Sequence, residues 1–167
     1  PPTDPRAALR AGLRDAATAP AAVTGTPGHE VHPASGPQVD ALEGHRPDGT
    51  PARIELGGRR TLIAFLSTTC DVCALFWERL GAGARLDTGD GSVEVVIVTR
   101  GPEREPSSGV AALAGAATVV QSDRSWHDHE VDGAPYFVLV AGQPAAVIGR
   151  GTAESWVELQ GLLMGNP

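Results

Sequence analysis

Residues 61–77 read TLIAFLSTTCDVCALFW, and this stretch determines the fold that the sequence predicts. Its first part, Thr61–Ser67, is a nearly continuous apolar run of strand length, which is typical of a strand buried on both faces. Cys70 and Cys73 follow directly. After them, apolar residues recur at helical spacing until Gly81, where we expect the helix to end. The stretch is therefore predicted to be a buried strand that runs into a helix, with two cysteines at the junction.

Strands and helices alternate along the rest of the chain. Runs of β-branched and apolar residues predict strands, and helical periodicity predicts helices. Residues 122–134 indicate a polar loop. This order predicts an α/β protein, a mixed β-sheet with helices on both faces. Beyond the unit described above, the predicted elements are strands at Arg53–Leu56, Ser92–Thr99 and Thr118–Gln121, helices at Pro106–Ala117 and Glu154–Met164, and a hairpin of Tyr136–Val140 with Ala145–Ile148.

The first fifty residues differ in composition from the remainder. They hold eight of the chain's 14 prolines and contain no Phe, Trp, Tyr, Ile or Cys. Such a segment buries too little apolar surface to offset its ordering entropy, about 1–2 kcal/mol per residue of backbone. We therefore expect residues 1–50 to be a largely irregular leader and residues 51–167 to form the domain.

Composition and charge exclude several classes of partner. The apolar share of 41% and charged share of 20% are ordinary for a soluble globular domain. A net charge of −7 argues against a nucleic-acid or anionic membrane surface, because both partners require basic patches. No run of 18 apolar residues occurs, so we expect no membrane contact by these residues. The chain opens at Pro1 and its only methionine is Met164, so we expect that a signal peptide, anchor or tag preceded it.

The spacing of Cys70 and Cys73 indicates redox chemistry. Two cysteines are too few for a disulfide scaffold in a chain of this length. The first sulfur is expected at the N-terminus of the helix, where free N–H groups and the helix dipole stabilise a thiolate. The second sulfur lies one turn further on, within reach of the first. Cys70 is therefore predicted to be the nucleophile and Cys73 the thiol that resolves a mixed disulfide.

Two alternatives to redox chemistry remain open at this point. The cysteine pair is half of many zinc sites, and His127 with His129 could supply two further ligands. The pair could also form a purely structural disulfide. We favour redox chemistry because no second cysteine pair exists and two histidines in a polar loop are commonly solvated. We expect no bound metal.

A proline before a strand supports the redox interpretation. Gly133, Ala134 and Pro135 precede the apolar run YFVLV, about sixty residues after the cysteines. Proline is tolerated at the first position of a strand because its missing N–H is not needed there. Most X–Pro bonds are trans, but together with the strand–cysteine–helix pattern we expect a cis Ala134–Pro135 bond. Such a bond would place a backbone edge against the cysteine pair, open to an extended peptide.

Taken together, residues 53–165 resemble the thioredoxin superfamily. The resemblance rests on the strand, the Cys70–Cys73 pair and its helix, the later Ala134–Pro135 step and the terminal helix. The stretch FLSTTCDVC looks most like extracytoplasmic, membrane-anchored thioredoxin-like proteins of the TlpA type and the accessory proteins of methylamine dehydrogenase maturation.

The resemblance implies a thioredoxin-like fold and thiol–disulfide exchange with protein cysteines and a redox partner, without a bound cofactor. It implies that Cys70 attacks, that Cys73 resolves, and that Ala134 and Pro135 line the substrate groove. It also implies an extracytoplasmic location with a preceding N-terminal membrane anchor. The alternative function is a non-enzymatic accessory or metal-binding module with the same fold.

Two departures from the superfamily pattern affect the expected chemistry. Cytosolic thioredoxins carry a buried Asp six residues before the first cysteine, and this chain has Ala64 there. We expect that proton relay to be absent or supplied by another group. Asp71 follows the nucleophile directly, and its carboxylate competes with the Cys70 thiolate for the positive end of the helix dipole. A less stabilised thiolate lowers the reduction potential, so we expect a reductant.

Overall fold

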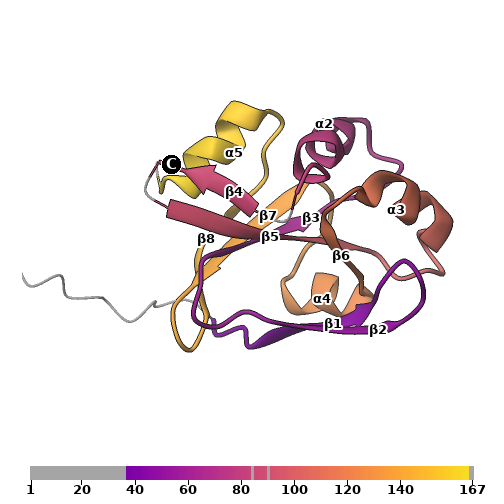
Figure 1. The fold of residues 1–167 in the computed structure, drawn as a ribbon, viewed down its shortest axis with the longest axis horizontal. Coiled ribbons are helices and arrows are strands. Elements are labelled where there is room, and N and C mark those ends of the chain that lie inside the picture. Colours follow the sequence, from indigo (N-terminus) through magenta and orange to yellow (C-terminus); the bar gives the residue numbers. More distant parts are fainter. Residues whose placement is uncertain (1–36, 84, 90, 166–167) are drawn as a thin grey trace, which may run out of the picture. The chain divides into compact units, whose positions relative to one another are not determined.

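The computed structural model describes residues 37–83, 85–89 and 91–165 (Figure 1). Within them, one mixed eight-stranded sheet runs in the order β2-β1-β6-β5-β3-β7-β8, with β4 paired to β5. The strands are β1 (Ala41–His45), β2 (Pro51–Glu55), β3 (Thr61–Phe65), β4 (Arg85–Thr88), β5 (Gly91–Thr99), β6 (Thr118–Gln121), β7 (Tyr136–Ala141) and β8 (Ala146–Gly151). The helices are α2 (Asp71–Leu80), α3 (Ser107–Ala114), α4 (Asp123–Asp128) and α5 (Trp156–Leu163).

Strand β3 is the centre of the sheet. All five of its residues are buried, as the continuous apolar run predicted. It pairs in parallel with β5 and antiparallel with β7, so it has neighbours on both sides. Helices cover both faces of the sheet: α2, α3 and α5 lie on one side and α4 on the other (Figure 1). The predicted fold class, a mixed α/β sheet with helices on both faces, is confirmed.

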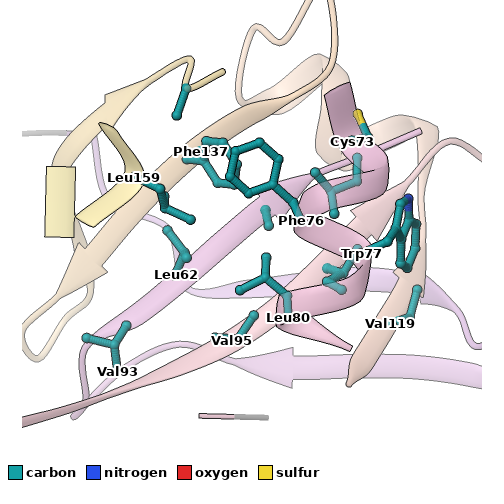
Figure 2. Close-up of a cluster of buried hydrophobic side chains, with 14 of the residues drawn as sticks. Leu62, Cys73, Phe76, Trp77, Leu80, Val93, Val95, Val119, Phe137 and Leu159 are labelled. Carbon is teal, nitrogen blue, oxygen red and sulfur yellow. The ribbon is translucent and has the colours of Figure 1, made fainter. Parts of the chain in front are cut away.

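Alternate side chains of β3 enter two separate hydrophobic clusters, because successive strand residues point to opposite faces. Leu62 packs on the α2 side, where the Phe76 and Phe137 rings meet edge to face with centroids 4.9 Å apart (Figure 2). Ile63 and Phe65 pack on the α4 side. Burying one large side chain contributes about 1.5–3 kcal/mol, so both clusters hold β3 in a single register.

Strand β1 lies inside the range 1–50 that we expected to be irregular. It forms a hairpin with β2, in which Leu42 stands opposite Ile54, and Leu42 is 1% exposed. The strand is held by its pairing with β2 and by Leu42, which packs in the hydrophobic cluster on the α4 face although the segment lacks aromatic residues. The domain therefore includes residues before 51. The rest of the expected leader, residues 1–36, lies outside the described residues.

The segment predicted to be a loop contains a short helix, α4. Ser122 caps it by accepting a hydrogen bond from the Ser125 backbone N–H at 3.1 Å. Most of its side chains are exposed and polar, so its sequence shows no helical pattern of apolar residues. Ser125 and Trp126 are its buried residues, and the Trp126 ring meets Phe65 edge to face with centroids 5.4 Å apart. No described helix is long and apolar enough to cross a membrane.

His129, the residue that ends α4, is buried beside the same phenylalanine. Its ring lies 5.3 Å from the Phe65 ring and its Nδ1 donates to the Ser125 carbonyl at 2.8 Å. Nε2 is buried and has no hydrogen-bond partner within the described part of the chain. Burial lowers the pKa of His129 from its ordinary value of 6.5, because an added proton would be poorly solvated.

We predict that His129 makes the free energy of unfolding depend on pH. Because the pKa of His129 is lower in the folded state, the unfolded chain binds a proton more readily. The free energy of unfolding therefore keeps its full value above pH 6.5 and declines below it. The loss amounts to at most about 1.4 kcal/mol per pH unit. Urea titrations between pH 7.5 and 5 measure this slope. His129→Gln removes part of it, whereas His127→Gln, a change at an exposed residue of the same helix, leaves it unchanged. Equal slopes in both variants contradict the prediction.

Candidate active site

Three segments that are distant in sequence meet at one edge of the sheet. Strand β3 ends at Phe65, and β5, parallel to it, ends at the same edge with Thr99. Strand β7 is antiparallel to β3 and begins there, with Tyr136 opposite Phe65. The backbone N–H of Leu66 also donates to the Val98 carbonyl at 3.2 Å. The loops that follow β3 and β5 and the loop that precedes β7 are therefore neighbours, at the edge where open α/β sheets bind ligands.

Cys70 lies at this edge as the N-cap residue of α2. Its Sγ accepts a hydrogen bond from the backbone N–H of Cys73 at 3.2 Å. The residue is partly exposed, and its thiol donates to the Ala134 carbonyl at 3.7 Å. Cys70 therefore lies at the helix N-terminus and next to the Ala134–Pro135 segment, as the sequence predicted.

Cys73 occupies a different environment one turn into the same helix. It is 0% exposed and belongs to the hydrophobic cluster on the α2 face (Figure 2). Burial raises the pKa of the Cys73 thiol to about 12, helped by its hydrogen bond with Cys70 and by the negative charges of Cys70 and Glu105. The backbone of Ser67 opposes this by hydrogen-bonding the sulfur, which lowers the pKa. Cys73 is therefore held as a neutral thiol.

The loop between β3 and α2 is tied to the helix by a tryptophan. The Trp77 indole N–H donates to the Ser67 carbonyl at 3.1 Å, and the side chain is 2% exposed. Trp77 thus combines packing in the cluster on the α2 face with a hydrogen bond to the loop. Since the indole spans from the second turn of α2 back to the loop, it fixes the backbone that precedes Cys70.

The Ala134–Pro135 segment lies against the cysteine pair. Both residues are partly exposed, and the peptide bond between them is cis. The Ala134 carbonyl accepts the hydrogen bond from the Cys70 thiol. Ala134 also packs against the hydrophobic clusters of both sheet faces, which holds the loop in place.

The histidines that could have completed a zinc site lie elsewhere. His127 lies in α4 and His129 caps its C-terminal end; α4 covers the sheet face opposite α2 (Figure 1), and His129 packs on Phe65. Within the described residues, no group of three or more His, Cys, Asp and Glu side chains is arranged to hold a metal ion. The structure therefore does not bring Cys70 and Cys73 together with the two histidines.

One acidic residue at this edge, Glu105, is not marked by any motif in the sequence. Glu105 follows β5, is 5% exposed, and its Oε2 accepts a hydrogen bond from the Thr68 backbone N–H at 3.3 Å. Composition and periodicity gave no sign of its burial, because it stands in the polar run GPEREPSS. The available signal was topological: Glu105 follows the strand that runs parallel to β3, so both loops reach the same edge.

The fold is similar to that of several solved structures. StoA from Bacillus subtilis is 16% identical with a TM-score of 0.54, over 76% of this chain and 99% of that one. A secreted disulfide oxidoreductase of Mycobacterium tuberculosis, homologous to E. coli DsbE, is 18% identical with a TM-score of 0.53, over 74% and 95%. The exposed lipoprotein thioredoxin of Streptococcus pneumoniae is 12% identical with a TM-score of 0.56, over 75% and 96%.

These similarities are similarities of fold. No protein-family model and no curated protein sequence matches the chain. The solved structures include a secreted disulfide oxidoreductase, a lipoprotein thioredoxin and the thioredoxin domain of a thiol–disulfide oxidoreductase from Bacteroides vulgatus. The chain therefore has a thioredoxin-like fold, and this fold carries a Cys-x-x-Cys pair at the N-terminus of α2.

We predict that alkylation of the reduced protein labels Cys70 before Cys73. Cys70 is partly exposed, whereas Cys73 is fully buried and its pKa is raised to about 12. Iodoacetamide at limiting concentration and pH 7, followed by peptide mass mapping, measures the order. The variants Cys70→Ser and Cys73→Ser give the alkylation rate of each thiol alone. We expect the Cys73→Ser protein, which keeps Cys70, to react at least tenfold faster than the Cys70→Ser protein. Preferential labelling of Cys73 would overturn this assignment.

Proposed function

We propose that this protein is a thiol–disulfide oxidoreductase that exchanges electrons with protein cysteines through Cys70 and Cys73. The observation that carries the proposal is the contrast between the two thiols. The Cys70 sulfur is partly open to solvent at a helix N-terminus and receives an N–H hydrogen bond, whereas Cys73 is fully buried one turn later. Exposed nucleophile and protected resolving thiol are the two parts that disulfide exchange requires.

In the reducing direction the reaction has two steps. The Cys70 thiolate attacks one sulfur of the substrate disulfide, forming a mixed disulfide and releasing the other sulfur as a thiolate. Cys73 then attacks Cys70, the Cys70–Cys73 disulfide forms, and the second substrate sulfur leaves. The 3.2 Å hydrogen bond from the Cys73 N–H to the Cys70 sulfur keeps the two residues in reach for the second step.

The Ala134–Pro135 segment is proposed as the substrate platform. Its carbonyl already points at the Cys70 thiol, so an extended peptide placed along this segment would present its sulfur to the nucleophile. Backbone hydrogen bonds along an exposed edge recognise many sequences, which suits a protein that acts on several partners. The substrate class is thus a protein with an accessible cysteine in an extended segment.

We further propose that the protein acts outside the cytoplasm and as a reductant. Its structural neighbours include a protein described as secreted and one described as an exposed lipoprotein. The resemblance to membrane-anchored thioredoxin-like proteins of the TlpA type adds the proposal that an N-terminal segment tethers the domain. The proposal that it acts as a reductant is based on Asp71. This residue lies in the first turn of α2, where its carboxylate competes with the Cys70 thiolate for the positive end of the helix dipole.

We predict that a Cys73→Ala variant accumulates a mixed disulfide at Cys70 with reducible proteins. Without the resolving thiol the first step proceeds and the second cannot, so the adduct persists. Incubation with oxidised insulin and intact-mass measurement detects it. The double variant Cys70→Ala, Cys73→Ala is the control and forms none. If Cys73→Ala forms no adduct while its thiol remains reactive to iodoacetamide, the accessory-module alternative replaces the proposed function.

We predict a reduction potential at or below about −200 mV, compared with about −120 mV for a strong oxidase. Equilibration in glutathione buffers, read by the two-dalton mass difference, gives the value. Asp71→Asn removes the competing carboxylate, stabilises the reduced form and raises the potential. Asp87→Asn, a change at an exposed residue of β4, is the matched control. A wild-type potential near that of the oxidase contradicts the reductant assignment, and an unchanged Asp71→Asn value shows that Asp71 does not set it.

A further inference from the structure

The second step of disulfide exchange requires a base. Cys73 attacks as a thiolate, yet its pKa is raised to about 12 by burial. In the mixed disulfide Cys70 carries no negative charge, but burial, the largest cause, still holds the pKa of Cys73 above its ordinary value of 9.0, so little thiolate is present at pH 7. The position that carries a buried Asp in cytosolic thioredoxins is Ala64 here, which is 0% exposed and has no titratable group. Some other group near Cys73 must therefore take its proton if resolution is to be fast.

Glu105 is held firmly at this edge of the sheet. Its backbone N–H donates to the Gly101 carbonyl at 3.0 Å, and its carbonyl accepts from Gln121 Nε2 at 2.9 Å. Gln121 is 1% exposed at the end of β6, and its Oε1 accepts from the Ser107 hydroxyl at 2.6 Å. A buried glutamine thus fixes the backbone of the loop after β5 at Glu105.

The Glu105 carboxyl group faces the loop that borders Cys73. Its Oε2 accepts from the Thr68 N–H at 3.3 Å, and the neighbouring Ser67 hydrogen-bonds the Cys73 sulfur through its backbone. The charge of Glu105 is felt at Cys73, where it favours the protonated thiol. Within the described ranges, no arginine forms an ion pair with Glu105, although the side chain is buried. A buried carboxylate without a counter-ion beside a buried thiol has a ready use as a proton acceptor.

We propose that Glu105 accepts the proton of Cys73 in the resolving step and that Gln121 positions it. The inference rests on the proposed function and adds the group that the Ala64 position lacks. The Cys73 S–H proton passes to the Glu105 carboxylate, directly or through one water molecule. The Cys73 sulfur then forms its bond to Cys70, the bond between Cys70 and the substrate sulfur breaks, and that sulfur leaves with the electron pair and takes a proton from solvent.

The test is a stopped-flow reaction of the reduced protein with 5,5′-dithiobis(2-nitrobenzoate). Attack by Cys70 releases the first nitrothiobenzoate, and attack by Cys73 on the mixed disulfide releases the second. The Cys73→Ala variant identifies the phases because it gives only the first. For Glu105→Gln we expect an unchanged first phase and a second phase slowed about 100-fold at pH 7. The slowing diminishes as pH rises, since hydroxide then removes the proton.

A purely electrostatic role of Glu105 predicts the opposite effect on the rate of the second phase. Removing the negative charge makes the Cys73 thiolate easier to form, so the second phase of Glu105→Gln would be unchanged or faster, and this result overturns the proposal. Glu103→Gln, a change at an exposed residue of the same loop, is the matched control and leaves both phases intact. Glu105→Asp, which keeps a carboxyl group, restores part of the rate. Gln121→Leu slows the second phase only, by displacing the loop.

Two readouts keep the inference separate from the proposed function and from misfolding. A normal first phase shows that the site of a variant is folded. If a variant loses both phases, the pH profile of the wild-type protein serves as the test instead. With a protein base, the wild-type second phase rises less than tenfold per pH unit between pH 6 and 9, and a full tenfold rise per unit contradicts the role of Glu105. If the wild-type protein itself shows no second phase, it is the proposed function that fails.

Discussion

The pairing of β3 with β5 on one side and β7 on the other is the constraint on which the rest of the structure depends. Every residue of β3 is buried, so the strand has no freedom to slip without exposing apolar surface on both faces. Its parallel and antiparallel neighbours then bring the loops that bear Cys70, Glu105 and Pro135 to one edge. The candidate site is a consequence of strand direction.

Helix α2 gives two chemically identical thiols different properties. At the N-cap, Cys70 meets solvent, a donor N–H and a backbone carbonyl. Three residues later the helix has turned its side chain into the core, and Cys73 packs with Phe76 and Phe137. The same turn that keeps the sulfurs within reach of each other therefore separates exposure from burial. Burial protects the resolving thiol but also raises its pKa, so the site needs a base as well as two sulfurs.

The two faces of the sheet serve different purposes. The α2 face carries the cysteines and the larger cluster, whereas the α4 face holds Trp126 and His129 in a second cluster. Both faces are needed to bury β3, and Leu42 of β1 contributes to the cluster on the α4 face. Solved structures at 12–18% identity have the same fold because burial pattern, rather than particular side chains, defines it.

The sequence by itself determined the elements with strong periodicity and the local chemistry between them. The β3–α2 unit, the helix end at Gly81, the β6 strand and the Cys70–Cys73 spacing are all encoded within short windows, where period and turn residues are direct signals. Weak or polar segments were missed: β1 and β4 are short strands that form hairpins with β2 and β5, and α4 is a polar helix held by Trp126 against the distant Phe65, so their own residues carry little pattern. The burial of Cys73 and Glu105, the place of Gln121, and the separation of His129 from the cysteines were decided only by the tertiary structure. Solvation and charge depend on which loops and faces the strand order brings together, and no local window contains that order.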